Sequence, residues 1–183
     1  MRFTLGGRRY DLTTRSLVIG RASDPQTARR LVDDGADVIE VADPDLVAAF
    51  VAAFAAVHDV HDVPVAIASA QLDAVRAAYQ AGAVLGACPD PAFLALSAEA
   101  GAAVLTPDPT PARAAGIPAD RIAVEWPAGA RPAATHPHAT LVTTDDLGAT
   151  ALAVTNGARL IRTANVKAAR RVADVLAAIL EAP

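Results

Sequence analysis

Charged side chains that could do chemistry stand at the ends of several short apolar segments. Arg162 is the clearest, because it comes where the apolar segment 160–163 runs out. An arginine at the carboxyl end of a parallel strand is where an α/β barrel usually presents an anion-binding group. Glu40 lies inside a second apolar segment, and Glu125 lies near the end of a third. Together they could act as acid and base, while Arg162 holds an anion.

Arg21 and Ser69 also follow apolar segments, so we count them with Glu40, Glu125 and Arg162 as candidate ligand-binding residues. A buried glutamate normally needs a partner, which Arg162 or Arg21 could supply to Glu40. A structural ion pair is therefore an open alternative to a ligand site. Glu125 either accepts a hydrogen bond from a heterocycle amine or is a solvated strand end. No residue can be assigned a catalytic role.

Other reactive side chains have simpler explanations. Asp24, Asp43 and Asp90 each precede a proline that can open a helix, so we interpret them as helix caps. Cys88 has no histidine beside it in the sequence, which favours a small buried apolar residue over a nucleophile.

The histidines do not form a metal motif. His58 and His61 fall where a helix leads into a strand, and His136 and His138 lie in a proline-rich stretch before another strand. Both places are on the side of a barrel opposite its active site. The chain has no zinc-ligand spacing, phosphate-binding glycine loop or nucleophile elbow. We expect no metal and no cofactor.

Eight apolar, β-branched segments alternate with helical patterns, which predicts a parallel sheet. The segments are 17–21, 38–42, 63–69, 84–87, 104–106, 122–126, 140–143 and 160–163. Eight strands favour a closed (β/α)8 barrel of the TIM type; an open doubly wound sheet is the alternative. Such barrels typically have ~250 residues. The missing length falls at 127–138, where prolines leave room only for a reduced helix between strands six and seven.

The inside of this barrel should be filled by branched apolar residues, and residues 3–12 should form a hairpin before the first core strand. The residues expected inside are Ile19, Ile39, Ile67, Leu105, Val124, Val142 and Ile161. We expect one domain over residues 1–183.

Composition narrows the class of protein. Hydrophobic residues make up 53% of the 183 residues but aromatic residues only 4%, as suits buried parallel strands covered by alanine-rich helices. A net charge of −4 gives no reason to expect a nucleic acid or an anionic membrane as partner. A single cysteine excludes an intramolecular disulfide framework, and no apolar run approaches the ~20 residues of a membrane span. We therefore expect a cytoplasmic protein.

Three segments resemble dihydropteroate synthase, the pterin-binding barrel of folate synthesis. They are Tyr10-Asp11-Leu12 followed by Leu17-Val18-Ile19-Gly20, the helix and strand of residues 28–41, and the C-terminal residues 149–179. The resemblance covers most of the chain and implies the same barrel. It also implies that Glu40 and Glu125 stand where that family contacts the pterin, and that Arg162 is retained.

The chain departs from the family at most other site positions. Ala68 and Ala87 stand where the family has an aspartate and an asparagine, and Ala164 stands where it has a histidine. Asp145 and Asp146 replace a cationic region, which places negative charge where a diphosphate should bind. The resemblance therefore implies the fold without the synthase reaction.

We expect a divergent, non-catalytic barrel that binds a pterin-like or anionic small molecule, or that associates with a partner. The partner would be a second copy or an authentic synthase, held through the C-terminal helices. Two alternatives remain: an enzyme of another reaction using Glu40, Glu125 and Arg162, and a residual synthase in folate biosynthesis. We also expect Glu40 and Arg162 to meet across the first core strand, where Gly20 offers no obstacle.

Overall fold

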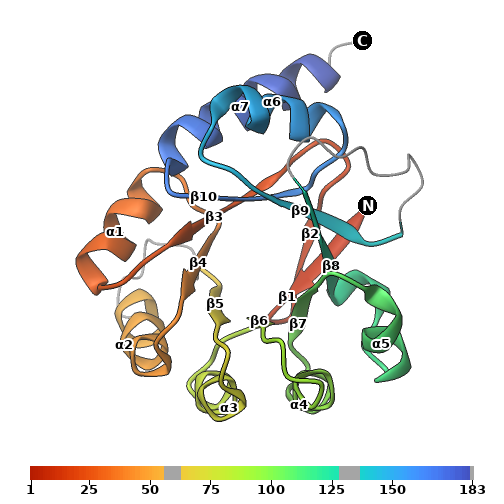
Figure 1. Ribbon diagram of the computed structural model, residues 1–183. Coiled ribbons are helices and arrows are strands. Elements are labelled where there is room, and N and C mark those ends of the chain that lie inside the picture. The colour runs from red at the N-terminus through yellow and green to blue at the C-terminus, as the bar shows by residue number, and fades with distance from the viewer. Residues whose placement is uncertain (56–62, 128–136, 182–183) are drawn as a thin grey trace.

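Eight parallel strands form a closed barrel in the computed structural model, which describes residues 1–55, 63–127 and 137–181 (Figure 1). Each strand pairs with its neighbours in chain order, and the last strand closes the ring against the first. The strands are β3 (Leu17–Arg21), β4 (Val38–Val41), β5 (Val65–Ala68), β6 (Leu85–Ala87), β7 (Ala103–Thr106), β8 (Ile122–Trp126), β9 (Ala139–Thr143) and β10 (Leu160–Thr163). The predicted barrel is confirmed, and the open sheet is excluded.

Helices cover the outside of the barrel. They are α1 (Pro25–Asp33), α2 (Pro44–Ala55), α3 (Leu72–Gln80), α4 (Phe93–Ala100), α5 (Pro109–Ala114), α6 (Leu147–Thr155) and α7 (Val166–Glu181), with a 3-10 turn, η1 (Ala119–Arg121), before β8. The reduced helix expected between β8 and β9 falls on residues 128–136, which lie outside the described part of the chain, as do His58, His61 and His136. No described helix has both the length and the apolar character that crossing a membrane requires.

Side chains alternate along each strand between the interior of the barrel and the layer of helices outside it. One buried cluster holds strand residues and no helix residues, and this is the interior; it includes Ile19, Leu85 and Leu141. A second cluster joins strand residues to residues of the helices, and this is the outer layer. The interior prediction was right for Ile19 and Leu105 and wrong for five residues, which lie in the outer layer: Ile39, Ile67, Val124, Val142 and Ile161.

The reason for that error is the pleat of the strand. Neighbouring residues on a strand point to opposite faces. Glu40 and Arg162 point toward the barrel axis, where they contact each other. Ile39 and Ile161 must therefore point outward to the helices.

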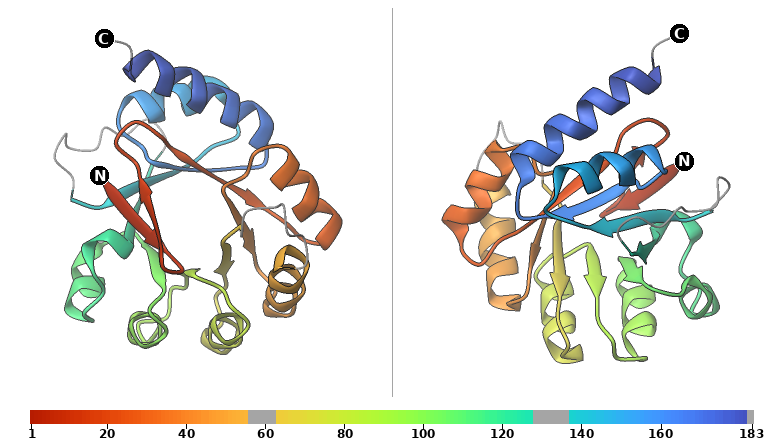
Figure 2. Two further views of the ribbon diagram at one scale, coloured as in Figure 1. Left: turned by 180° about the vertical axis from the view of Figure 1, so that it is seen from behind. Right: turned by 45° about the horizontal axis from the view of Figure 1, so that its top comes forward.

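A hairpin closes the end of the barrel at which the strands begin. It consists of β1 (Arg2–Leu5) and β2 (Arg8–Asp11), paired antiparallel. Phe3, Leu5 and Leu12 are fully buried and belong to the interior cluster. In Figure 2, left, the hairpin lies across the near end of the barrel. Because the hairpin covers this end, the accessible end of the barrel is the opposite one, at the carboxyl ends of the strands. We call this end the mouth.

The strand before Cys88, β6, packs closely against the surrounding helices at Gly86. A Cβ at Gly86 would collide with the hydroxyl of Tyr79 and with the ring of Phe93. That hydroxyl is hydrogen-bonded to Ser97, and burial raises the pKa of Tyr79 to about 12. Cys88 itself is half-buried and packs against the outer layer, so it is less buried than expected.

Candidate functional site

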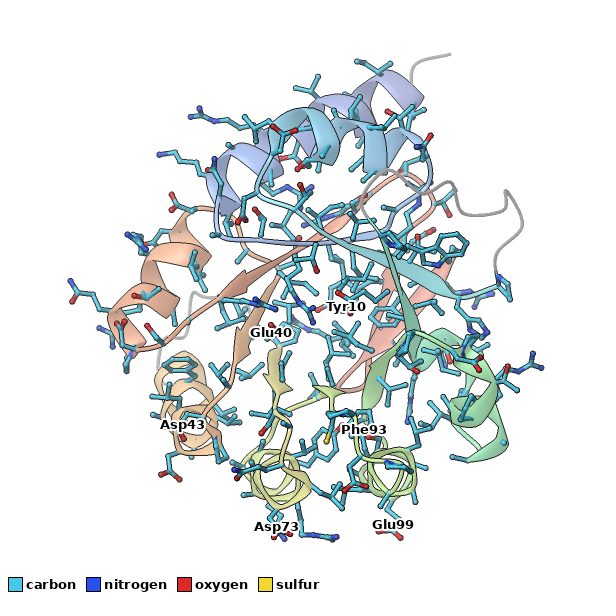
Figure 3. All side chains as sticks on the ribbon, viewed as in Figure 1. Tyr10, Glu40, Asp43, Asp73, Phe93 and Glu99 are labelled. Atoms are coloured by element: carbon cyan, nitrogen blue, oxygen red, sulfur yellow. The ribbon has the colours of Figure 1, made fainter. Side chains whose placement is uncertain are left out.

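Four charged residues meet at the mouth of the barrel. Arg21, Glu40, Glu125 and Arg162 come from β3, β4, β8 and β10, each near the carboxyl end of its strand. Alternation along the strands turns all four to the same side as the interior cluster. Figure 3 shows Glu40 beside the opening of the barrel. Four of the five candidate residues are thus brought together.

The four side chains form one connected network. Arg162 Nη2 donates to Glu40 Oε2 at 2.7 Å, and Arg162 Nη1 donates to Glu125 Oε1 at 3.3 Å. Arg21 Nε donates to the other oxygen of Glu40 at 2.8 Å. Thr143, which the sequence reasoning did not single out, donates to Glu125 Oε1 at 3.1 Å. Two carboxylates therefore alternate with two guanidinium groups across the mouth.

Burial divides this network into a core and a rim. The side chains of Glu40 and Arg162 are 3% and 7% exposed, whereas those of Arg21 and Glu125 are 60% and 46% exposed. Arg162 Nε is buried and has no hydrogen-bond partner among the described residues. The Glu40–Arg162 pair is therefore strongly held, because a buried charge without a partner is costly.

The predicted contact between Glu40 and Arg162 is present, but the reason we gave for it was wrong. β3 does lie between β4 and β10. Gly20, however, faces outward: a Cβ there would meet Val166 and Leu31 of the helix layer. The two charged groups meet on the inner face of β3: Arg162 is the register partner of Ile19, and Glu40 is the register partner of Arg21.

A pocket of about 540 Å³ opens beside Glu40. It is lined by the ends of β3, β4 and β5 and the loops that follow, including Arg21, Ser23, Asp43 and Ala68. Ser69 is not part of this lining; its hydroxyl accepts a hydrogen bond from the backbone N–H of Gln71 at 3.2 Å. The structure therefore does not bring Ser69 to the pocket.

The aspartates of the mouth serve the helix starts. Asp24 caps α1 through Thr27 N, and Asp43 and Asp90 accept backbone N–H groups two residues on. Hydrogen bonds from Thr27 hold the pKa of Asp24 below its usual value. The helix-cap interpretation is confirmed for Asp24 and agrees with the contact of Asp43. It was wrong for Asp90, because α4 begins only at Phe93, after Ala92, and Asp90 lies in the turn before the helix.

Asp145 and Asp146 also have local roles, which the sequence reasoning missed. Asp146 caps α6 through Ala149 N, and Asp145 accepts Ala164 N at 2.7 Å and the hydroxyl of Thr163 at 3.0 Å. The hydrogen bond from the backbone N–H of Ala164 lowers the pKa of Asp145 most, and the hydrogen bond from the hydroxyl of Thr163 lowers it further. A lowered pKa means that these contacts stabilise the fold at neutral pH and are lost as the pH falls through that lowered value.

Carboxylates outnumber cations around the mouth. The first turns of the helices and the loops before them carry Asp24, Asp43, Asp45, Asp73, Asp90, Asp108, Asp145 and Asp146. Among the residues that the structure describes, the cations at this end are Arg21, Arg162 and Lys167. The field at the mouth therefore favours ligands that are cationic or rich in hydrogen-bond donors over polyanions. In the described part of the chain, no three His, Cys, Asp or Glu side chains are grouped as metal ligands would be.

The fold and the position of the site define a TIM-type α/β barrel with an ionic network at its mouth. Over its whole length the fold is that of dihydropteroate synthase. The Yersinia pestis dihydropteroate synthase superimposes with a TM-score of 0.81, covering 100% of this chain and 99% of that one, at 18% identity. Mycobacterium tuberculosis Rv1207 gives a TM-score of 0.80 at 25% identity, covering 98% of this chain and 97% of that one.

A third similar structure is a complex with 7,8-dihydropteroate. The Xanthomonas albilineans dihydropteroate synthase in complex with 7,8-dihydropteroate gives a TM-score of 0.77 at 16% identity, covering 100% of this chain and 99% of that one. No protein-family model matches the chain, and no curated protein matches it in sequence. The predicted resemblance is thus confirmed at the level of the fold.

Proposed function

We propose that this protein is a cytoplasmic, non-catalytic barrel that binds a pterin-like small molecule in the pocket beside Glu40. The proposal depends mainly on the burial and ion pairing of Arg162. Its guanidinium is 7% exposed and is paired with Glu40 and Glu125. An arginine held in this way is not free to stabilise an anion such as a departing diphosphate.

The same pairing argues against the alternative enzyme. A general acid or base must exchange a proton with a substrate within hydrogen-bond reach. Both oxygens of Glu40 accept from arginine, and Glu125 accepts from Arg162 and Thr143. Both oxygens of Glu40 are therefore engaged by arginine donors and are not free to take a proton from a substrate. An anionic ligand is likewise disfavoured, because the carboxylates of Glu40 and Asp43 both line the pocket.

A pterin-like heterocycle fits what remains. The pocket is lined by the carboxylates of Glu40 and Asp43 and by the apolar side chains of Leu46 and Ala68, among others. Its volume of about 540 Å³ lies in the range of small-molecule sites. The similar Xanthomonas albilineans enzyme is described with 7,8-dihydropteroate bound, which supports the choice of a pterin.

This proposal is tested by turnover and by binding. With a pterin diphosphate, p-aminobenzoate and Mg²⁺, the protein should form no dihydropteroate above background. A pterin alone should raise the melting temperature, because a ligand that binds only the folded state stabilises it. Ala68→Leu should abolish that shift, since a leucine at Ala68 fills the pocket while leaving the ionic network intact.

Ala87→Leu is the matched control. Ala87 is the register partner of Ala68 on the next strand and is not part of the pocket lining. It should keep the pterin-dependent shift. Turnover by the purified protein, or a shift that Ala68→Leu leaves unchanged, would contradict the proposal.

We further propose that the protein forms a homodimer through α6 and α7, which pack against each other on one side of the barrel (Figure 2, right). These helices carry most of the exposed large apolar residues of the described chain. Val175, Ile179 and Leu180 are 59%, 62% and 52% exposed, and Leu152 is 50% exposed. A single apolar face can meet its own copy about a two-fold axis.

Changing this face should dissociate the dimer. Val175→Glu with Ile179→Glu should raise the dimer dissociation constant on the order of thirtyfold, equivalent to about 2 kcal/mol for a side chain central to an interface. Light scattering over a wide range of concentrations measures the change. Ala95→Glu, on the exposed side of α4, should leave the dimer intact. A monomer at all concentrations would contradict the proposal, and pairing only with an authentic synthase would replace the second copy as partner.

A further inference from the structure

We propose that Arg21 competes with the ligand for the carboxylate of Glu40. Its guanidinium fills the site that a planar, guanidinium-like ligand would bind, and it thereby restricts which ligands can bind. The inference rests on the proposed ligand site beside Glu40. It adds the chemical class of the ligand and names a residue that competes with it.

The geometry separates the two arginines that contact Glu40. Arg162 lies inside the barrel and is 7% exposed, so it stays with Glu40. Arg21 lies on the rim, is 60% exposed and lines the pocket. It reaches one carboxylate oxygen of Glu40, Oε1, through Nε at 2.8 Å. A ligand that enters the pocket can therefore reach Glu40 by displacing Arg21 alone.

Displacing Arg21 costs little. An ion pair with one well-exposed partner contributes little to stability, because water screens the charge and the long side chain loses conformational freedom. A second carboxylate is also close: Arg21 helps to lower the pKa of Asp145. The released side chain therefore remains near a negative charge.

Arg21 also indicates what kind of group Glu40 accepts. A guanidinium presents flat N–H donors and a delocalised positive charge to a carboxylate. Asp43 adds a second carboxylate to the lining of the same pocket. The favoured ligand is thus a planar amidine or guanidine, a class that includes the cyclic guanidine of a pterin. A compact ammonium lacks this shape, and an anion is repelled.

Arg21→Met tests this inference, because methionine keeps an aliphatic stem but has no donor. The probe is methylguanidinium chloride, titrated by calorimetry at concentrations far below those that unfold proteins. If Arg21 occupies its place nine-tenths of the time, removing it should tighten methylguanidinium binding roughly tenfold. Methylammonium chloride should show no such gain. Arg21→Leu, which likewise has no donor, provides a second variant and should behave in the same way.

Arg15→Met is the matched control. Arg15 is 59% exposed and pairs with Asp37, which is 11% exposed, at 2.6 Å, so it resembles Arg21 without lining the pocket. It should bind the probe as the wild type does. The inference would be overturned if Arg15→Met and Arg21→Met tightened binding of the probe equally. It would also be overturned if neither variant of Arg21 bound the probe more tightly than the wild type.

The two proposals fail in different ways. If the wild type binds a pterin in a manner that Ala68→Leu abolishes, but the Arg21 variants bind no more tightly, only the role of Arg21 is refuted. If neither the wild type nor the Arg21 variants bind a pterin or the probe, the proposed ligand site is refuted as well. Binding by the Arg21 variants alone would support the role of Arg21 but would refute pterin binding by the wild type.

Discussion

Replacing Arg162 by methionine is expected to lower the free energy of unfolding by about 3–5 kcal/mol, because it leaves a buried carboxylate without its buried partner. Glu40 is 3% exposed and would keep only Arg21, whose side chain is 60% exposed. For a chain of this size the melting temperature should fall by roughly 10 °C. Urea denaturation of the wild type and the variant gives the measurement.

A double-mutant cycle separates the ion pair from the rest of the mouth. Glu40→Met with Arg162→Met should cost less than the sum of the two single changes, because both remove the same interaction. Arg15→Met breaks a pair of similar length whose arginine is 59% exposed and whose carboxylate keeps Arg170 as a partner, so it should cost only about 0–1 kcal/mol.

The opposite result has a clear meaning. If Arg162 were reserved for an anionic ligand, Arg162→Met would leave stability nearly unchanged. It would instead abolish stabilisation by phosphate. That outcome would contradict both the structural role of the pair and the proposed function.

Replacing Asp37 by alanine should destabilise the other end of the barrel by a similar amount, on the order of 3–5 kcal/mol. Asp37 Oδ2 accepts from Val18 N and from Arg170 Nη1, each at 2.8 Å, and Oδ1 accepts from Arg15. Arg170 is 12% exposed, so losing Asp37 leaves its buried charge with only the carbonyl of Ser16 and the exposed Asp174 as partners. It also leaves the backbone N–H of Val18 without its acceptor. Urea denaturation again measures the loss.

Asp174→Ala is the control for this prediction. Asp174 contacts the same arginine at 2.7 Å but is 64% exposed. Its removal should cost only about 0.3–0.5 kcal/mol. Equal losses from the two variants would show that Asp37 does not anchor α7 to the start of β3.

Most of the fold could be predicted because its signals are local. Each strand is a short apolar segment bounded by a helix cap or a glycine, and Asp24 and Gly157 mark such boundaries without any knowledge of distant contacts. Counting eight such units was enough to favour closure of the sheet over an open arrangement. The resemblance to dihydropteroate synthase rested on the same segments and was confirmed as a likeness of fold.

The face to which a residue points was harder to predict. Ile39 and Glu40 were both expected inside the barrel, although neighbours on a strand cannot share a face. The ion pairs determine the orientation, since Glu40 contacts Arg162 and Arg21 on the inner side of the barrel. A strict period of two along β4 would have corrected Ile39 from the sequence alone.

The sequence by itself determined the barrel, the order of its strands and the positions at which charged residues stand at strand ends. Only the tertiary structure decided that Arg162 is shared between Glu40 and Glu125, that Ser69 lies outside the pocket and that Asp145 holds the loop after β10. The physical reason is that strand patterns and helix caps depend on residues a few positions apart. The pairing of charges depends instead on the register of strands far apart in the chain, which is set only when the barrel closes.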